Sequence, residues 1–262
     1  MKRVILAQIK QIGKGKLKYI TFIFLIGVAV LNVMNFDFYR DGELMGIETS
    51  ACTFFYTVYF TFFSTMHLFI GVSVFDICAG DFSDKTFYYE ILSGQTRFSS
   101  YFGRAVTAIV FTLIGSIILV TVPVVICSAV CGWGTLFTVG DIVQRLLISI
   151  LPIIRIICMY ICFEFILKKY SIMNFMAGFM ISMMCEEGFF NNAQPAILGS
   201  TSLLRLCSFD IWANYGLNDI HTPVVDATIP AGEIQSIVIW SIIASAAFLI
   251  IGYAYFHHDD LN

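Results

Sequence analysis

The sequence predicts an all-α integral membrane protein in which residues 1–262 form a single domain with six transmembrane helices. Hydrophobic residues make up 58% of the chain and charged residues only 13%, whereas soluble domains carry roughly 25% charged residues. The mean hydropathy is +0.85, and the apolar residues gather in helix-length runs. A lipid bilayer is therefore the expected solvent. The net charge of −3 is too small to indicate a nucleic-acid partner.

Six apolar runs are predicted as membrane spans. They cover residues 19–36, 51–75, 105–130, 142–167, 171–185 and 234–256. The fifth is short for a bilayer that needs about 20 helical residues, and Pro123 is expected to bend the third. Ahead of the first span, residues 1–18 alternate basic and apolar side chains at helical spacing, which favours an amphipathic helix lying on the membrane surface. A flexible basic tail is the alternative.

The distribution of Lys and Arg predicts the orientation. These residues gather before the first span, between the second and third, and between the fourth and fifth. Because basic loops stay in the cytoplasm, both termini are expected inside. Residues 76–104 then form a cytoplasmic loop, and residues 186–233 form an acidic external segment.

The loop at residues 76–104 carries the signals of a short helix. Gly80 is expected to end the second span, and Gly94 is well placed as a helix C-cap. The residues expected to cap the new helix and supply its first-turn acids are Asp81, Ser83 and Asp84. Phe82, Tyr89 and Leu92 fall near one face of that helix. The loop therefore predicts a capped amphipathic helix tethered between two spans.

This loop resembles the first cytoplasmic loop of ATP-binding-cassette transporter permeases of the type-2 exporter class. The matching pattern is Gly80-Asp81-Phe82-(x2)-Lys85-Thr86-(x3)-Glu90-Ile91-Leu92-Ser93-Gly94-(x2)-Arg97. Such permeases have six spans with both termini inside, an amphipathic elbow helix first, a coupling helix between spans two and three, and an external re-entrant hairpin between spans five and six. The resemblance places these features at residues 1–18, 76–104 and 186–233, and covers essentially the whole chain.

The resemblance implies a permease subunit of an ATP-driven exporter that moves an amphipathic or hydrophobic cargo, such as an antimicrobial peptide, across a bacterial plasma membrane. No Gly-x4-Gly-Lys-Ser/Thr phosphate loop occurs, so the chain is not expected to be an enzyme or to bind a cofactor. A partner ATP-binding-cassette ATPase subunit would bind ATP and Mg²⁺, and a second permease subunit, identical or related, would complete the pathway. The residues expected to touch or position the ATPase are Asp81, Asp84, Lys85, Thr86, Tyr89, Glu90 and Arg97. The alternative is that these are solvated loop residues.

Three polar residues within the spans are candidate pathway or subunit contacts. Arg155 lies near the middle of the fourth span, where a charge costs at least ~2.5–3.5 kcal/mol, so it should face protein or a water-filled cavity. Glu164 is on the opposite face and about 13 Å further along the axis, so Arg155 should pair with Asp76, Asn174 or a partner subunit instead. His67 is the third candidate, and a hydrogen-bonded core histidine is its alternative interpretation.

Two rival functions remain open. A non-transporting membrane sensor or immunity protein would have the same hydropathy plan. An intramembrane protease is more remote: Glu186-Glu187 resembles the paired glutamates of the prenyl-endopeptidase-like family, but Phe190 and Asn191 stand where that pattern needs Arg. No catalytic residue is therefore assigned. No metal site is expected either, because the paired cysteines in the spans lack His or carboxylate neighbours.

Overall fold

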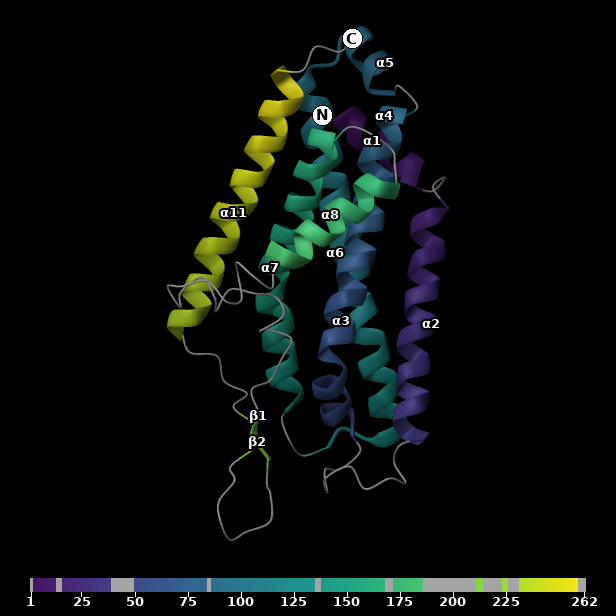
Figure 1. Ribbon diagram of the computed structural model, residues 1–262, viewed down its shortest axis with the longest axis vertical. Coiled ribbons are helices and arrows are strands. Elements are labelled where there is room, and N and C mark those ends of the chain that lie inside the picture. The colour runs from purple at the N-terminus through teal and green to yellow at the C-terminus, as the bar shows by residue number, and fades with distance from the viewer. Residues whose placement is uncertain are drawn as a thin grey trace.

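The computed structural model describes residues 2–12, 16–38, 50–83, 86–134, 138–167, 172–185, 211–213, 223–225 and 231–258. Five long helices run along the long axis of the molecule (Figure 1). They are α2 (Leu17–Phe38), α3 (Ala51–Val74), α6 (Arg97–Cys131), α7 (Val139–Leu167) and α11 (Ala231–His258). The described part of the chain is thus built on a helical bundle.

Shorter elements lie at the two ends and on the flanks of this bundle. The helical ones are α1 (Lys2–Ile12), the π-helix η2 (Phe75–Ala79), α4 (Gly80–Ser83), α5 (Thr86–Leu92) and α8 (Ile172–Met184). Strand β1 (Ile211–Ala213) pairs antiparallel with β2 (Pro223–Val225). Figure 1 shows α1, α4, α5 and the C-terminal end of α11 at one end of the molecule and the strand pair toward the other.

Three described helices are long and apolar enough to cross a membrane, by length and composition. They are Arg97–Cys131, Val139–Leu167 and Ile234–His258. Shorter apolar helical stretches cover Leu17–Val33, Phe63–Cys78 and Phe175–Met184. The prediction of a helical membrane protein is confirmed in this coarser form, and the small strand pair in the segment 186–233 was not predicted. Most of the segment 186–233, where the re-entrant hairpin was expected, falls outside the described residues.

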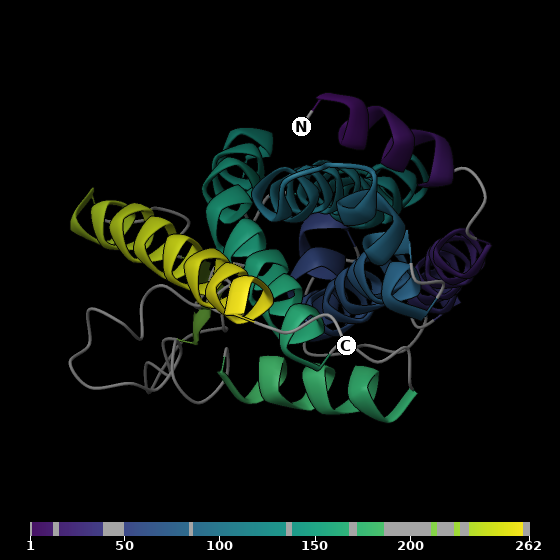
Figure 2. The same ribbon diagram turned by 90° about the horizontal axis from the view of Figure 1, so that it is seen from above.

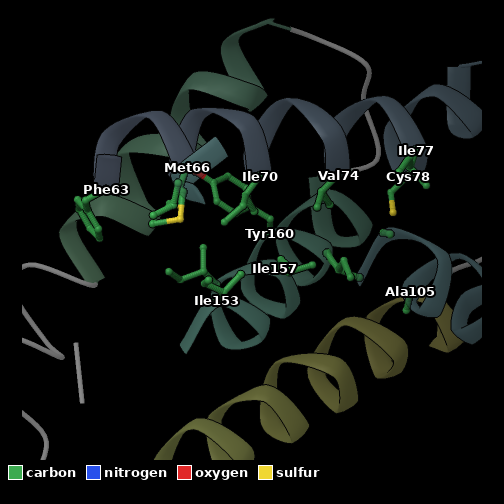
Figure 3. Packing of buried hydrophobic residues seen from close by; sticks show 14 of the residues in the cluster. Phe63, Met66, Ile70, Val74, Ile77, Cys78, Ala105, Ile153, Ile157 and Tyr160 are labelled. Atoms are coloured by element: carbon green, nitrogen blue, oxygen red, sulfur yellow. The ribbon is translucent and has the colours of Figure 1, made fainter. Parts of the chain in front are cut away.

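Helix α3 lies at the centre of the bundle, with α2, α6, α7 and α8 around it. Viewed along the bundle, α1 lies across the outside of α6 and α8 lies on the opposite flank (Figure 2). The core between α3 and α7 is filled by side chains such as Met66 and Ile70 facing Ile153 and Ile157 (Figure 3). α11 packs chiefly on α7, so much of its apolar surface stays uncovered.

Glycines let two helix pairs approach closely. At Gly103 of α6, an added Cβ would lie 2.8 Å from Cγ1 of Val4, so α1 packs directly on the α6 backbone. At Gly115 of α6, an added Cβ would overlap the Phe69 ring of α3. Because real Cβ atoms do not approach other atoms this closely, these two positions hold α1 and α3 against α6.

The structure corrects the predicted end of the second span. Gly80 has helical torsions, φ −55° and ψ −41°, and does not interrupt the chain of helices. α3 instead passes into the π-helix η2 and then α4, so helical structure runs to Ser83. π-helical turns accommodate an extra residue without breaking a helix, which explains why a glycine there is not a stop signal. Similarly, α6 begins at Arg97 rather than near residue 105, because the Thr96 hydroxyl accepts a hydrogen bond from the Ser99 backbone N–H at 3.2 Å and caps it.

Candidate functional site

The inner face of α5 is held by an aromatic cluster. Phe87 is fully buried and stacks on Phe82 of α4 with ring centroids 4.4 Å apart. The same ring contacts Phe165 of α7 at 5.6 Å and Phe256 of α11 at 5.2 Å. Aromatic rings bury large apolar areas and pack edge to face, so this cluster fixes α5 against the ends of α7 and α11.

A partly buried ion pair then joins α5 to α6. The Arg104 guanidinium donates to both carboxylate oxygens of Glu90, at 2.8 Å and 2.9 Å, and to the Ser100 hydroxyl at 2.6 Å. The guanidinium carbon also lies 3.8 Å from the centroid of the Phe87 ring. Two parallel hydrogen bonds between charged groups fix both distance and orientation. Glu90 therefore holds α5 at a defined angle to α6.

The other end of the helix is also fixed. Gly94 adopts φ 89° and its N–H donates to the Ile91 carbonyl at 3.0 Å, so the predicted glycine C-cap is confirmed.

Arg97 Nη1 donates to the His257 carbonyl at 2.7 Å and to the Phe256 carbonyl at 3.3 Å. A guanidinium at a helix C-terminus satisfies otherwise unpaired carbonyls and complements the helix dipole. Arg97 thus ties the start of α6 to the end of α11.

The outer face of α5 is apolar and exposed. Tyr89 keeps 68% and Leu92 keeps 82% of its surface accessible. These side chains point away from the face that Phe87 and Glu90 fix to the bundle. The sequence placed Phe82, Tyr89 and Leu92 on one face, which is wrong, because Phe82 belongs to a separate helix and packs inward on Phe87.

The predicted ATPase contacts fall into three groups. Thr86 and Tyr89 lie on α5, and Tyr89 points outward. Glu90 and Arg97 make the intramolecular contacts described above: Glu90 fixes α5 to α6, and Arg97 ties α6 to α11. Asp84 and Lys85 lie outside the described residues, and of Asp81 only its place on α4 is described.

A second ion pair joins α2 to η2 at the same end of the bundle. Lys18 Nζ, at the start of α2, lies 2.6 Å from the Asp76 carboxylate in η2, and both side chains are largely buried. Asp76 was one of the partners predicted for Arg155, and the structure gives it Lys18 instead. The sequence analysis missed Lys18 and Arg104 as structural groups because both lie in basic stretches that look like solvated loop ends.

The three polar candidates inside the spans are all buried: Arg155 and His67 completely, and Glu164 with 2% of its surface exposed. His67 on α3 lies near Tyr160 on α7, with ring centroids 6.3 Å apart, and close enough to Arg155 to interact electrostatically. Glu164 lies one turn beyond Tyr160 on α7. The structure thus places His67 close to Tyr160, with Arg155 within electrostatic range of His67 and Glu164 within electrostatic range of Tyr160.

Comparison of this chain with protein-family models, with curated proteins and with solved structures finds no match. The functional interpretation therefore rests on the geometry of the chain itself. That geometry comprises an apolar helical bundle, a short helix fixed to one end with an exposed outer face, and a buried polar cluster beneath it.

Proposed function

We propose that this protein is the membrane-spanning permease subunit of an ATP-driven exporter, and that α5 is the coupling helix on which a separate ATP-binding-cassette ATPase subunit docks. The observation that carries the proposal is the two-sided character of α5. Its inner face is fixed by Phe87 and by the Glu90–Arg104 pair, while Tyr89 and Leu92 stay exposed. A helix that is fixed to the bundle and apolar on its outer face suits a partner that pushes on it.

The contacts of α5 give a route for such a push. Glu90 and Arg104 link α5 to α6, Phe87 links it to α7 and α11, and α4 and η2 join it to α3. Closure of an ATPase dimer against α5 would therefore tilt several helices together. A two-state equilibrium shifts from 1:99 to 99:1 for about 5.5 kcal/mol of differential binding, which the binding of ATP to the partner would supply.

The membrane arrangement belongs to the same proposal. α2 has 22 residues and α3 has 24, enough for a bilayer that requires about 20, and α8 would complete a set of six spans. Exposed apolar side chains such as Ile23 of α2 and Ile250 of α11 suit contact with lipid. Both termini and α5 would then lie in the cytoplasm of a bacterium, with the protein in the plasma membrane and a second permease subunit beside it.

The elbow helix of the proposal is α1. Val4 packs on Gly103 of α6 and Lys18 pairs with Asp76 of η2, so the N-terminal segment is attached to the same helices that α5 moves. The basic side chain Lys10 near its end suits an anionic cytoplasmic membrane surface.

Purification of the full chain from its native membranes in mild detergent tests this function. The complex is expected to contain a second polypeptide that hydrolyses ATP, and Leu92→Asp is expected to abolish both its retention and the ATP hydrolysis. Val139→Asp is the matched control, because Val139 is an apolar residue of α7 with 56% exposure at the opposite end of the bundle. An intact, folded chain that carries no ATPase in any preparation would favour a membrane sensor over an exporter.

A further inference from the structure

Several polar groups buried between α3, α7 and α8 are poorly supplied with hydrogen bonds in the described part of the chain. Both ring nitrogens of His67 and Oε2 of Glu164 have no hydrogen-bond partner there, and the hydroxyls of Tyr160 and Ser182 lie within reach of each other. Buried polar groups in folded proteins are satisfied in more than about 90% of cases. A cluster of exceptions within one helix interface therefore calls for a ligand or for ordered water.

These groups converge around Tyr160. Its ring lies against Gly71 of α3, where an added Cβ would be 3.0 Å away, and 4.0 Å from the equivalent position at Gly178 of α8. The absence of side chains at both glycines lets the ring enter between the three helices, as its place beside Met66 and Ile70 of α3 in Figure 3 shows. Its hydroxyl lies within hydrogen-bonding reach of Ser182 and close enough to Glu164 to interact with it electrostatically.

The charges at the two ends of the cluster differ. Arg155 lies near His67 at one end, and Glu164 lies at the other, near the C-terminal end of α7. Glu164 is 2% exposed, and its Oε2 has no hydrogen-bond partner among the described residues. An ionisable side chain buried within a membrane helix marks a functional site by default, because the cost of burying it must be offset by a partner. The oxygens of Glu164, Tyr160 and Ser182 can all accept hydrogen bonds from a cation.

We infer that Glu164, Tyr160 and Ser182 form a recognition site for the cationic head group, ammonium or guanidinium, of an amphiphilic ligand whose apolar part lies against α3 and α8. Glu164 lies about 4.5 Å along the axis from the last residue of α7, so the head group would sit close to the membrane interface and the tail would extend into the apolar interior. This inference rests on the proposed exporter function, and it names the chemical class of the cargo.

The site also lies directly below the coupling helix. Phe165, the residue after Glu164, contacts Phe87 of α5 with ring centroids 5.6 Å apart. A ligand that moves this part of α7 would therefore move a residue on which α5 packs. Cargo binding and ATPase docking would influence each other through this contact, since any coupling between two sites is reciprocal.

Binding of a defined probe to the purified full chain in lipid nanodiscs tests the site without any ATPase. The probe is octylguanidinium, and the neutral control of the same shape is octylurea, with affinity measured by calorimetry and by the shift in Tm. The wild type is expected to bind octylguanidinium and to show no measurable binding of octylurea. Glu164→Gln should lower the affinity for octylguanidinium at least about tenfold, because hydrogen bonds to a charged group are stronger than those between neutral groups.

Two milder variants keep the test decisive if the glutamine variant does not fold. Tyr160→Phe and Ser182→Ala each remove a single hydroxyl, so each variant should fold and should bind octylguanidinium roughly threefold to tenfold more weakly. Asp141→Asn is the matched control, because it neutralises a carboxylate at the far end of α7 and should bind the probe normally.

The outcomes separate this inference from the function beneath it. Equal binding of octylguanidinium and octylurea, or unchanged affinity in all three site variants, would overturn the cation site even if an ATPase co-purifies. Selective cation binding that depends on Glu164, in a chain that never associates with an ATPase, would keep the site and overturn the exporter.

Discussion

The Arg104 guanidinium binds both carboxylate oxygens of Glu90, at 2.8 Å and 2.9 Å, and so fixes α5 to α6. Arg104 is completely buried, and Glu90, Ser100 and the Phe87 ring compensate its charge. A buried charge that loses its partner is costly, whereas an intact pair is nearly neutral for stability. The value of this pair is therefore the fixed orientation of α5 rather than a gain in global stability.

Glu90→Gln is expected to release α5 locally. The amide keeps one acceptor oxygen but loses the charge, which should cost roughly 1–3 kcal/mol of local stability. Hydrogen exchange of the α5 amides should accelerate by at least tenfold, while exchange in the middle of α7 stays unchanged. Asp141→Asn, which neutralises a carboxylate far from α5, should leave α5 exchange as in the wild type. Unchanged α5 exchange in Glu90→Gln would show that the pair does not hold the helix.

Replacing Lys18 with Met should destabilise the end of the bundle where α2 and η2 meet. The Asp76 carboxylate would remain largely buried without its partner, which typically costs about 3–5 kcal/mol. Thermal unfolding in detergent should show a clear fall in Tm. The double variant Lys18→Met/Asp76→Leu should recover most of it, because no uncompensated charge is left. A double variant as unstable as the single one would mean that packing, not charge, is what Lys18 supplies.

Much of this end of the molecule could be anticipated from residues close together in the sequence. Gly94 and the helix before it follow from local cap and turn preferences, and the apolar runs correspond to described helices. The Glu90–Arg104 and Lys18–Asp76 ion pairs could not be predicted from the sequence, because each joins residues from different helices and depends on how those helices pack. Gly80 misled the prediction because glycine marks a helix end only where the chain adopts a positive φ, which it does not there.

Replacing a glycine by alanine should have opposite effects on stability at the close helix contact of Gly115 and at an open position such as Gly27. Gly115→Ala would place a methyl group into the Phe69 ring and should cost about 1–3 kcal/mol through overpacking. Gly27→Ala on α2 meets nothing within 4 Å, so the same change there should stabilise the helix by roughly 0.5–1 kcal/mol. Comparison of the two variants by denaturant unfolding separates packing from helix propensity. A stabilising Gly115→Ala would contradict the packing of α3 on α6.

Attachment of α1 to α6 can be tested at a single contact. Gly103→Ala would place its Cβ 2.8 Å from Cγ1 of Val4, which is too close, and should therefore push α1 off α6. Trypsin cleavage at Lys10 should then become faster, because a detached short helix is marginal on its own. Adding Val4→Ala makes room for the methyl group and should restore resistance. Cleavage that is equally fast in the wild type and in Gly103→Ala would show that α1 does not depend on this contact.

The most direct test of the docking role of α5 is site-specific photo-crosslinking from position 92 in native membranes. Leu92 is the most exposed apolar side chain of α5, so a photoreactive amino acid there should cross-link to the ATPase subunit, and the cross-link should strengthen when ATP is bound without hydrolysis. The same amino acid at position 139, at the far end of the bundle, should not capture that subunit. Labelling of position 92 from outside intact cells, or the absence of any cross-linked ATPase, would contradict the assignment of α5 as a coupling helix.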